Sequence, residues 1–143
     1  MQELHGYYLE DLEVGMSASY AKTITDADVI LFAGISGDNN PIHINDEYAQ
    51  TTPFKQRIVH GMFSAALIST VAGTRLPGPG AIYVDQQLKF KAPVHIGDTA
   101  RASLTVTEID ERRRRVKCRT DVHVGDTLVA TGEGTFMVDR REA

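Results

Sequence analysis

The sequence predicts an α+β fold in which one antiparallel sheet curls around a central helix. An apolar segment without charges runs from Gly61 to Thr74, with small or apolar residues on every side. Such a segment is typical of a helix buried all round, and it is too short to cross a bilayer. The chain after it alternates apolar and polar residues with period two, which is typical of consecutive strands. Covering one buried helix with these strands is the economical packing.

The part of the chain before this helix predicts one strand and two shorter helices. Residues 14–24 are expected to form the strand. Thr25 can cap a helix that follows, and the acidic residues after it suit the positive end of the helix dipole. Val29, Phe32 and Ala33 form one apolar stripe on that helix, which is expected to stop within residues 34–37. A second short helix is expected at residues 47–49.

Four strands are expected after the central helix, separated partly by glycine-aspartate turns at 97–98 and 125–126. The first strand spans residues 81–94. Each strand places one set of apolar residues on the inner face, in order: Ile82, Val84, Leu88, Phe90 and Ala92; Ala100, Ala102, Leu104 and Val106; Val116, Cys118 and Val122; Leu128, Ala130, Phe136 and Val138.

Composition excludes several classes of function. The net charge of −4 offers no general basic field, so no nucleic acid is expected as a partner. The one basic run, 112–115, is interpreted as a solvated hairpin end, with contact to an anionic ligand as its alternative. The N-terminus does not resemble a signal peptide, so a cytoplasmic location without membrane contact is expected. Cys118 is the only cysteine, which excludes an internal disulfide.

Asp38 and His43 stand five residues apart and carry most of the information on function. A carboxylate and an imidazole are matched for moving protons near neutral pH. The Asn-Asn-Pro sequence between them predicts a turn that stops a helix. We therefore expect both groups on one rigid loop, holding a single water between them.

A second functional group is expected where the central helix begins. His60-Gly61-Met62 opens the apolar segment, and a glycine at a helix start exposes its backbone N–H to a ligand oxygen. No metal and no cofactor are expected, because His43 and His60 lack closely spaced partners in the sequence. Phosphate-binding glycine loops and a nucleophile elbow are also absent from the sequence.

These motifs resemble those of the MaoC-like family, which includes R-specific 2-enoyl-CoA hydratases. Residues 32–43, followed by Tyr48-Ala49, resemble the hydratase motif of that family. Residues 58–62 resemble the start of its central helix, and residues 88–94 resemble its first long strand. The resemblance extends over nearly the whole chain and implies a single hot-dog domain over residues 1–143.

The resemblance implies reversible addition of water to a trans-2-enoyl-CoA, which gives an R-3-hydroxyacyl-CoA. Asp38 and His43 would activate the water, and which of the two takes its proton is left open. The N–H of Gly61 would bind the thioester oxygen, where negative charge develops. Asn40 is expected to orient Asp38 or His43 through hydrogen bonds. By resemblance, the Ser69 hydroxyl would support Asp38 or the water, with core packing as its alternative.

The partners expected are an acyl-CoA substrate and a second copy of the chain, because members of the family usually pair their sheets. The acyl chain is expected beside the central helix, at Phe63, Ala66 and Leu67. The product would supply polyhydroxyalkanoate synthesis or connect to β-oxidation.

Three alternatives remain beside the hydratase. The first is a dehydratase acting on acyl-carrier-protein substrates or on acyl-CoA in a specialised pathway. For a carrier protein, Lys89, Lys91 and the 112–115 run would supply a basic rim. The second is an acyl-thioester-binding module without catalysis, which would be marked by loss of Asp38 or His43. The third, a thioesterase, is disfavoured because residues 61–74 contain no acid.

Overall fold

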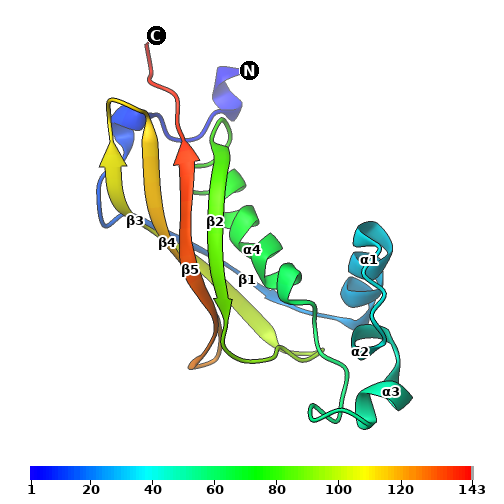
Figure 1. Cartoon of the computed structure of the whole chain (residues 1–143). Helices are drawn as coiled ribbons and strands as arrows, with labels where there is room; N and C mark the ends of the chain where they lie inside the picture. Colours follow the sequence, from blue (N-terminus) through cyan, green and yellow to red (C-terminus); the bar gives the residue numbers. More distant parts are fainter. Residues whose placement is uncertain (143) are drawn as a thin grey trace.

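The computed structural model describes residues 1–142, and it places one antiparallel sheet against a central helix, with a lobe of three helices to one side (Figure 1). The strands are β1 (Ser17–Thr23), β2 (Ile82–Phe90), β3 (Thr99–Asp110), β4 (Arg115–Val124) and β5 (Thr127–Met137). The helices are α1 (Asp26–Ser36), α2 (Pro41–Ile44), α3 (Asp46–Gln50) and α4 (Gly61–Thr74), with single 3-10 turns at Gln2–Leu4 and Leu9–Asp11. The strand order is β1-β3-β4-β5-β2. The predicted α+β class is confirmed.

The core lies between the sheet and one side of α4. Alternate residues of β3 face the helix and are fully buried, among them Ala100, Ala102 and Leu104. Phe63, Leu67, Ile68 and Val71 of α4 meet them from the other side. Successive residues of a strand point to opposite faces, so the period-two pattern of the sequence predicted this layer correctly.

The central helix has the bounds that the sequence predicts, but it is not buried all round. The sheet covers one side only, and Met62 is 61% exposed on the other. Ala66, Ser69 and Gly73 are exposed as well. An apolar pattern predicts burial without saying what covers each face, and a single copy of this sheet leaves one face of α4 open.

Strand β2 forms one edge of the sheet and departs from the predicted alternation. The register between β2 and β5 shifts between Tyr83 and Asp85, which is the mark of a β-bulge. Because a bulge inserts one extra residue, it reverses the side-chain direction beyond it. Tyr83, before the bulge, and Gln86, after it, therefore both point inward. Tyr83 packs on the buried Phe136, and Gln86 donates from Nε2 to Oγ1 of the buried Thr120 at 2.8 Å. The prediction that Ile82 and Val84 share the inner face with Leu88 is wrong, since Ile82 is 53% exposed and Val84 is 46% exposed.

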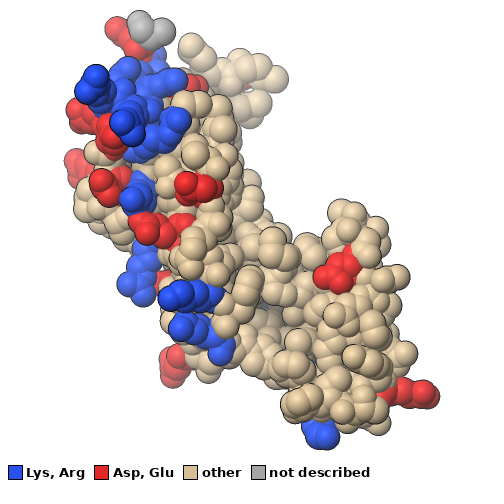
Figure 2. Space-filling view, viewed as in Figure 1, with Lys and Arg blue, Asp and Glu red and all other residues tan. Residues whose placement is uncertain are grey.

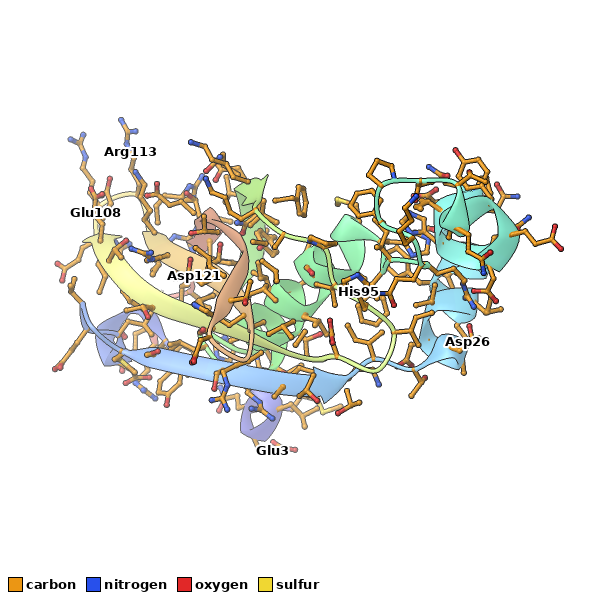
Figure 3. The ribbon with its side chains drawn as sticks, turned by 90° about the horizontal axis from the view of Figure 1, so that it is seen from below. Glu3, Asp26, His95, Glu108, Arg113 and Asp121 are labelled. Carbon is orange, nitrogen blue, oxygen red and sulfur yellow. The ribbon has the colours of Figure 1, made fainter. Side chains whose placement is uncertain are left out.

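The basic run lies in the turn between β3 and β4. The guanidinium of Arg114 pairs with Asp139 at 3.3 Å, and Arg115 donates to the carbonyl of Arg113. Figure 2 shows Lys and Arg gathered over this end of the sheet. Figure 3 places Arg113 at the end of the molecule opposite to Asp26, where the helical lobe begins. The interpretation as a hairpin end is therefore confirmed, and the run is remote from the Asp38 motif.

Two further predictions concern Cys118 and the possibility of a membrane-spanning helix. Cys118 is fully buried on β4, as its place in the alternating pattern predicts. Among residues 1–142, no helix combines the length and the hydropathy that crossing a membrane would require.

Candidate active site

The loop that carries Asp38 is shaped by the end of α1. Thr25 caps the helix by accepting a hydrogen bond from the Asp28 N–H at 3.2 Å, as predicted. The helix ends at Gly37, whose φ of 79° lies in the left-handed region that favours glycine. The chain then turns, and the Asp38 N–H donates to Oγ of Ser36 at 3.1 Å. These contacts place Asp38 on the surface directly after the helix.

His43 was predicted to share this loop with Asp38, but it lies on the short helix α2 instead. Pro41 occupies the first helical position, where its missing N–H costs nothing. The side chain of Asn40 caps α2 by accepting from the Ile42 N–H at 3.2 Å. The Asn-Asn-Pro sequence thus stops one helix and starts the next. It turns His43 inward, where the side chain is only 8% exposed.

Asn40 contacts both catalytic candidates in the supporting way that the sequence predicts. Its N–H donates to Oδ1 of Asp38 at 3.3 Å, while its side chain caps the helix of His43. Asn40 therefore links the position of the carboxylate to that of the imidazole, and its role as a supporting residue stays a prediction.

Arg57 holds α2 against α1 and was not singled out in the sequence. Its Nε donates to the carbonyl of His43 at 2.6 Å, and its Nη2 pairs with Oδ1 of Asp26 at 2.7 Å. The two contacts join segments 14 and 31 residues away along the chain. No local pattern reports such a contact, which explains why sequence reasoning missed it.

His60 completes a compact cluster with the two predicted residues. Asp38, His43 and His60 each bring one side-chain N or O atom to within 4.8 Å of the others. The rings of His43 and His60 stack with centroids 3.8 Å apart and an angle of 23°. The Nε2–H of His60 donates to the Asp38 carbonyl at 2.9 Å. His60 was not singled out as a site residue from the sequence; its place directly before Gly61 was the one available signal.

The surroundings of His43 hold its imidazole in the neutral form. Its Nδ1–H donates to the carbonyl of Ile58 at 2.7 Å, which leaves Nε2 with a free lone pair. Burial lowers the pKa of His43 below its usual 6.5, and the positive charge of a protonated His60 would lower it further. The Ile58 contact and the Asp38 carboxylate oppose this shift without reversing it. At neutral pH, Nε2 is therefore able to accept a proton.

Gly61 lies beside this cluster at the first position of α4, where the helix has no side-chain cap. Its N–H has no hydrogen-bond partner within residues 1–142. Gly61 and His60 line a cleft of about 360 Å³ together with Phe54, Ile58, Val59, Ser64, Phe90, Lys91, Ala92, Pro93, Val94 and Val129. An open N–H at a helix N-terminus within such a cleft is suited to an oxygen that gains negative charge.

The structure separates the other predicted site residues from this cluster. Ser69 is exposed on the open side of α4, eight residues beyond Gly61 and thus about 12 Å along the helix axis. Phe63 and Leu67 pack into the core, while Ala66 is exposed. None of the three lines a described cleft, so the acyl-chain pocket at these positions stays a prediction. A cleft of about 460 Å³ between α4 and β2 is lined instead by Met62, Ala65, Tyr83, Gln86, Leu88 and Phe90.

Metal binding was not expected, because His43 and His60 lack close partners in the sequence. In the folded chain, however, the two histidines do have close partners, because one ligand atom from each of Asp38, His43 and His60 lies within 4.8 Å of the others. Backbone carbonyls nevertheless engage one ring nitrogen of each histidine. The absence of a metal from the function therefore stays a prediction.

Comparisons with known proteins agree with this site and fold. Residues 11–133 match the family described as MaoC like domain. An (R)-specific enoyl-CoA hydratase from Rhodospirillum rubrum is 58% identical over 135 residues, which cover 94% of each chain. A 3-hydroxybutyryl-CoA dehydratase from Methylorubrum extorquens is 47% identical over 99% of this chain and 90% of its own. The unliganded R-hydratase PhaJ1 from Pseudomonas aeruginosa superposes with a TM-score of 0.88 at 44% identity, over 94% of this chain and 86% of that one. The α+β fold is thus the hot-dog fold, and the chain belongs to the MaoC-like family.

Proposed function

We propose that the protein is an R-specific enoyl-CoA hydratase that adds water reversibly to trans-2-enoyl-CoA. The observation that carries the proposal is the Asp38 carboxylate clustered with the neutral imidazole of His43, next to the open N–H of Gly61. The names of the relatives at 58% and 47% identity supply the substrate class and describe the two directions of one reaction. The chain is accordingly a hydro-lyase.

In the proposed reaction, one water lies between the carboxylate of Asp38 and Nε2 of His43 and donates to both. The water oxygen forms a bond to C3 of the enoyl group while one water proton passes to this pair. Electron density moves through C2 to the thioester oxygen, and the Gly61 N–H stabilises the charge there. A proton then returns to C2, so Asp38 and His43 finish in their starting protonation states.

The test is hydration of crotonyl-CoA, followed as loss of the conjugated enoyl-thioester absorbance, with the handedness of the product determined. Asp38→Asn keeps an oxygen that can accept from the Asn40 N–H, so the loop should keep its shape. The variant should lose about 10²–10⁴ in kcat, which is typical for removal of a general acid or base. Asp126→Asn, in the exposed turn between β4 and β5, is the matched control.

Wild-type turnover to the R-alcohol that is lost in Asp38→Asn and kept in Asp126→Asn supports the proposal. Near-normal turnover by folded Asp38→Asn would remove this carboxylate from the mechanism. If folded wild-type protein leaves both crotonyl-CoA and longer enoyl-CoA substrates unchanged, the module without catalysis becomes the better description.

Lys91 is the residue in the cleft that could contact the carrier of the acyl group. Lys91 lines the same cleft as Gly61 and offers a positive charge to the phosphates of an incoming carrier arm. Coenzyme A and the phosphopantetheine of an acyl carrier protein both supply such phosphates, so the dehydratase of carrier-bound substrates is the second candidate. We expect CoA thioesters to be preferred, as the ratio of kcat/KM for the two crotonyl substrates would measure. The cytoplasmic location and the supply of polyhydroxyalkanoate synthesis stay predictions from the sequence.

We further propose that the protein acts as a homodimer joined along β2. Strand β2 is an edge of the sheet and exposes Ile82, Val84 and Phe90, whereas the other edge, β1, exposes no large apolar side chain. An exposed apolar edge strand is a site for pairing with another chain. The open face of α4 lies on the same side as β2 (Figure 1), so a second copy there would cover both.

Light scattering coupled to size exclusion tests this assembly. A homodimer is expected at micromolar concentration, and Val84→Lys should shift the population toward monomer by placing a charge in the proposed interface. Thr107→Lys, which places the same charge on the solvent side of β3, is the control. A wild-type monomer at micromolar concentration would contradict the proposal.

A further inference from the structure

His60 makes contact with each part of the proposed catalytic site, and it is buried, with only 2% of its surface exposed. It donates to the carbonyl of Asp38, stacks on the ring of His43 and directly precedes Gly61. These three groups come from three separate segments: the loop after α1, helix α2 and the start of α4. A single imidazole therefore stands where the three segments meet.

The contact with His60 joins Asp38 to a distant segment, whereas its hydrogen bonds with Ser36 and Asn40 are local. Asp38 is exposed and lies on a short connection between two helices, so packing does not hold it. Within residues 1–142, the only hydrogen bond to its carbonyl oxygen comes from His60. Its carboxylate receives one backbone N–H, from Asn40, on the same connection. His60 is thus the group that ties this connection to the central helix.

The second ring nitrogen of His60 argues against a role in core packing alone. Because Nε2–H donates to a carbonyl, Nδ1 carries a lone pair, yet it is buried without any hydrogen-bond partner in the described part of the chain. Buried polar atoms are nearly always paired, and an unpaired one calls for an explanation. An apolar side chain would fill the same space without this penalty. The imidazole at this position is therefore better explained by what Nε2–H holds in place.

We propose that His60 is a positioning residue for the hydratase reaction, which holds Asp38 against His43 and beside the Gly61 N–H through its hydrogen bond to the Asp38 carbonyl. This inference rests on the proposed roles of Asp38 and His43. His60 itself touches neither the water nor the thioester in this assignment. Stacking on the ring of His43 holds the His60 imidazole in place. The hydrogen bond from its Nε2–H then holds the backbone of Asp38.

Variants that separate the hydrogen bond from the volume of the ring test the proposal. His60→Gln keeps an N–H donor close to the place of Nε2, whereas His60→Leu and His60→Phe fill the site without a donor. We expect the two apolar variants to lose about 10–100-fold in kcat for crotonyl-CoA, as is typical when a supporting residue lets a reacting group move. KM and the melting temperature should stay near the wild-type values, because neither the cleft nor the core loses its packing. His60→Gln should restore most of kcat.

His123→Gln is the control for loss of an imidazole, since His123 lies on β4 away from the cluster. It should keep the wild-type kcat. Folded His60→Leu or His60→Phe with wild-type kcat would overturn the proposal, as would folded His60→Gln as slow as the apolar variants. If the apolar variants do not fold, the result for His60→Gln decides alone.

Asp38→Asn, measured beside these variants, separates the test of His60 from the test of the proposed hydratase function. Loss of turnover in Asp38→Asn with full turnover in the apolar variants refutes the role of His60 only. Full turnover in Asp38→Asn refutes the proposed function of the cluster, and the role of His60 with it.

Discussion

The proposed oxyanion contact can be tested by a pair of substitutions at Gly61 that differ mainly in one N–H. Gly61→Pro removes this N–H, and Gly61→Ala keeps it. Proline is accepted at the first helical position because that N–H takes no part in the helix. The preceding residue, His60, has a ψ of 134°, in the extended range favoured before proline. The helix should therefore begin at the same place in both variants.

Both substitutions introduce a Cβ atom at the same place, which makes them a matched pair. This atom would lie 3.1 Å from Cε1 of Phe90, closer than most packed side chains allow. The atoms that it meets belong to the Phe90 side chain rather than to the backbone, so a small shift of this ring relieves the contact. Gly61→Ala thus measures the effect of the added carbon, with a small expected loss. Removal of one oxyanion donor typically costs about 10²–10³ in kcat, or about 2.7–4 kcal/mol, and this is the difference expected between Pro and Ala.

The assay is the crotonyl-CoA hydration described above, with the melting temperature of each variant as the check on folding. Gly61→Ala should turn over at close to the wild-type rate. Gly61→Pro should have a kcat lower by about 10²–10³-fold, the typical effect of losing one oxyanion donor. Equal turnover in two folded variants would exclude the oxyanion role of Gly61, because its N–H would then contribute nothing to kcat. Equal and severe loss in both would assign the effect to contact with Phe90 instead.

Three further predictions concern pH and stability. Since burial lowers the pKa of His43 below 6.5, kcat/KM should persist below pH 6.5; a rate profile with its acidic limb above that value contradicts this. The unfolded chain takes up this proton first as the pH falls, so urea unfolding should also show stability declining below pH 6.5. Gly132→Ala places a Cβ atom against the backbone oxygen of Gln87, which cannot move away without shifting β2. It should therefore lower the free energy of unfolding by about 1–3 kcal/mol, and an unchanged urea midpoint would contradict the close approach. Thr25→Ala removes the cap of α1 and should cost about 1 kcal/mol by the same measurement, whereas Thr25→Ser should cost little.

Most of the fold could be predicted because its signals are local. The apolar pattern of residues 61–74 gave the bounds of α4, and Thr25 marked the start of α1. Alternation along β3, β4 and most of β5 identified the inner face of the sheet. Such signals arise from the geometry of a helix or a strand within a few residues, so they do not depend on distant partners.

The departures occur where a distant partner or a local irregularity decides. The bulge in β2 depends on how this strand meets β5, so Val84 was assigned to the wrong face. The central helix keeps an open side because one sheet covers only one face of it. The helix that carries His43 is a single turn, too short to show a period of its own.

The residue types and the spacing of Asp38 and His43 were enough to suggest the proposed chemistry, since a carboxylate and an imidazole this close in sequence suit proton transfer to and from water. Their arrangement in space was decided by contacts across the fold. His60 reaches Asp38 over 22 residues, and Arg57 reaches Asp26 over 31. Hydrogen bonds of this range form only after the helical lobe has packed against the start of α4, and the sequence pattern does not specify that packing. The chain thus carries its proposed catalytic groups in one motif, while tertiary structure buries His43, lowers the pKa of its imidazole and places both groups near the start of α4.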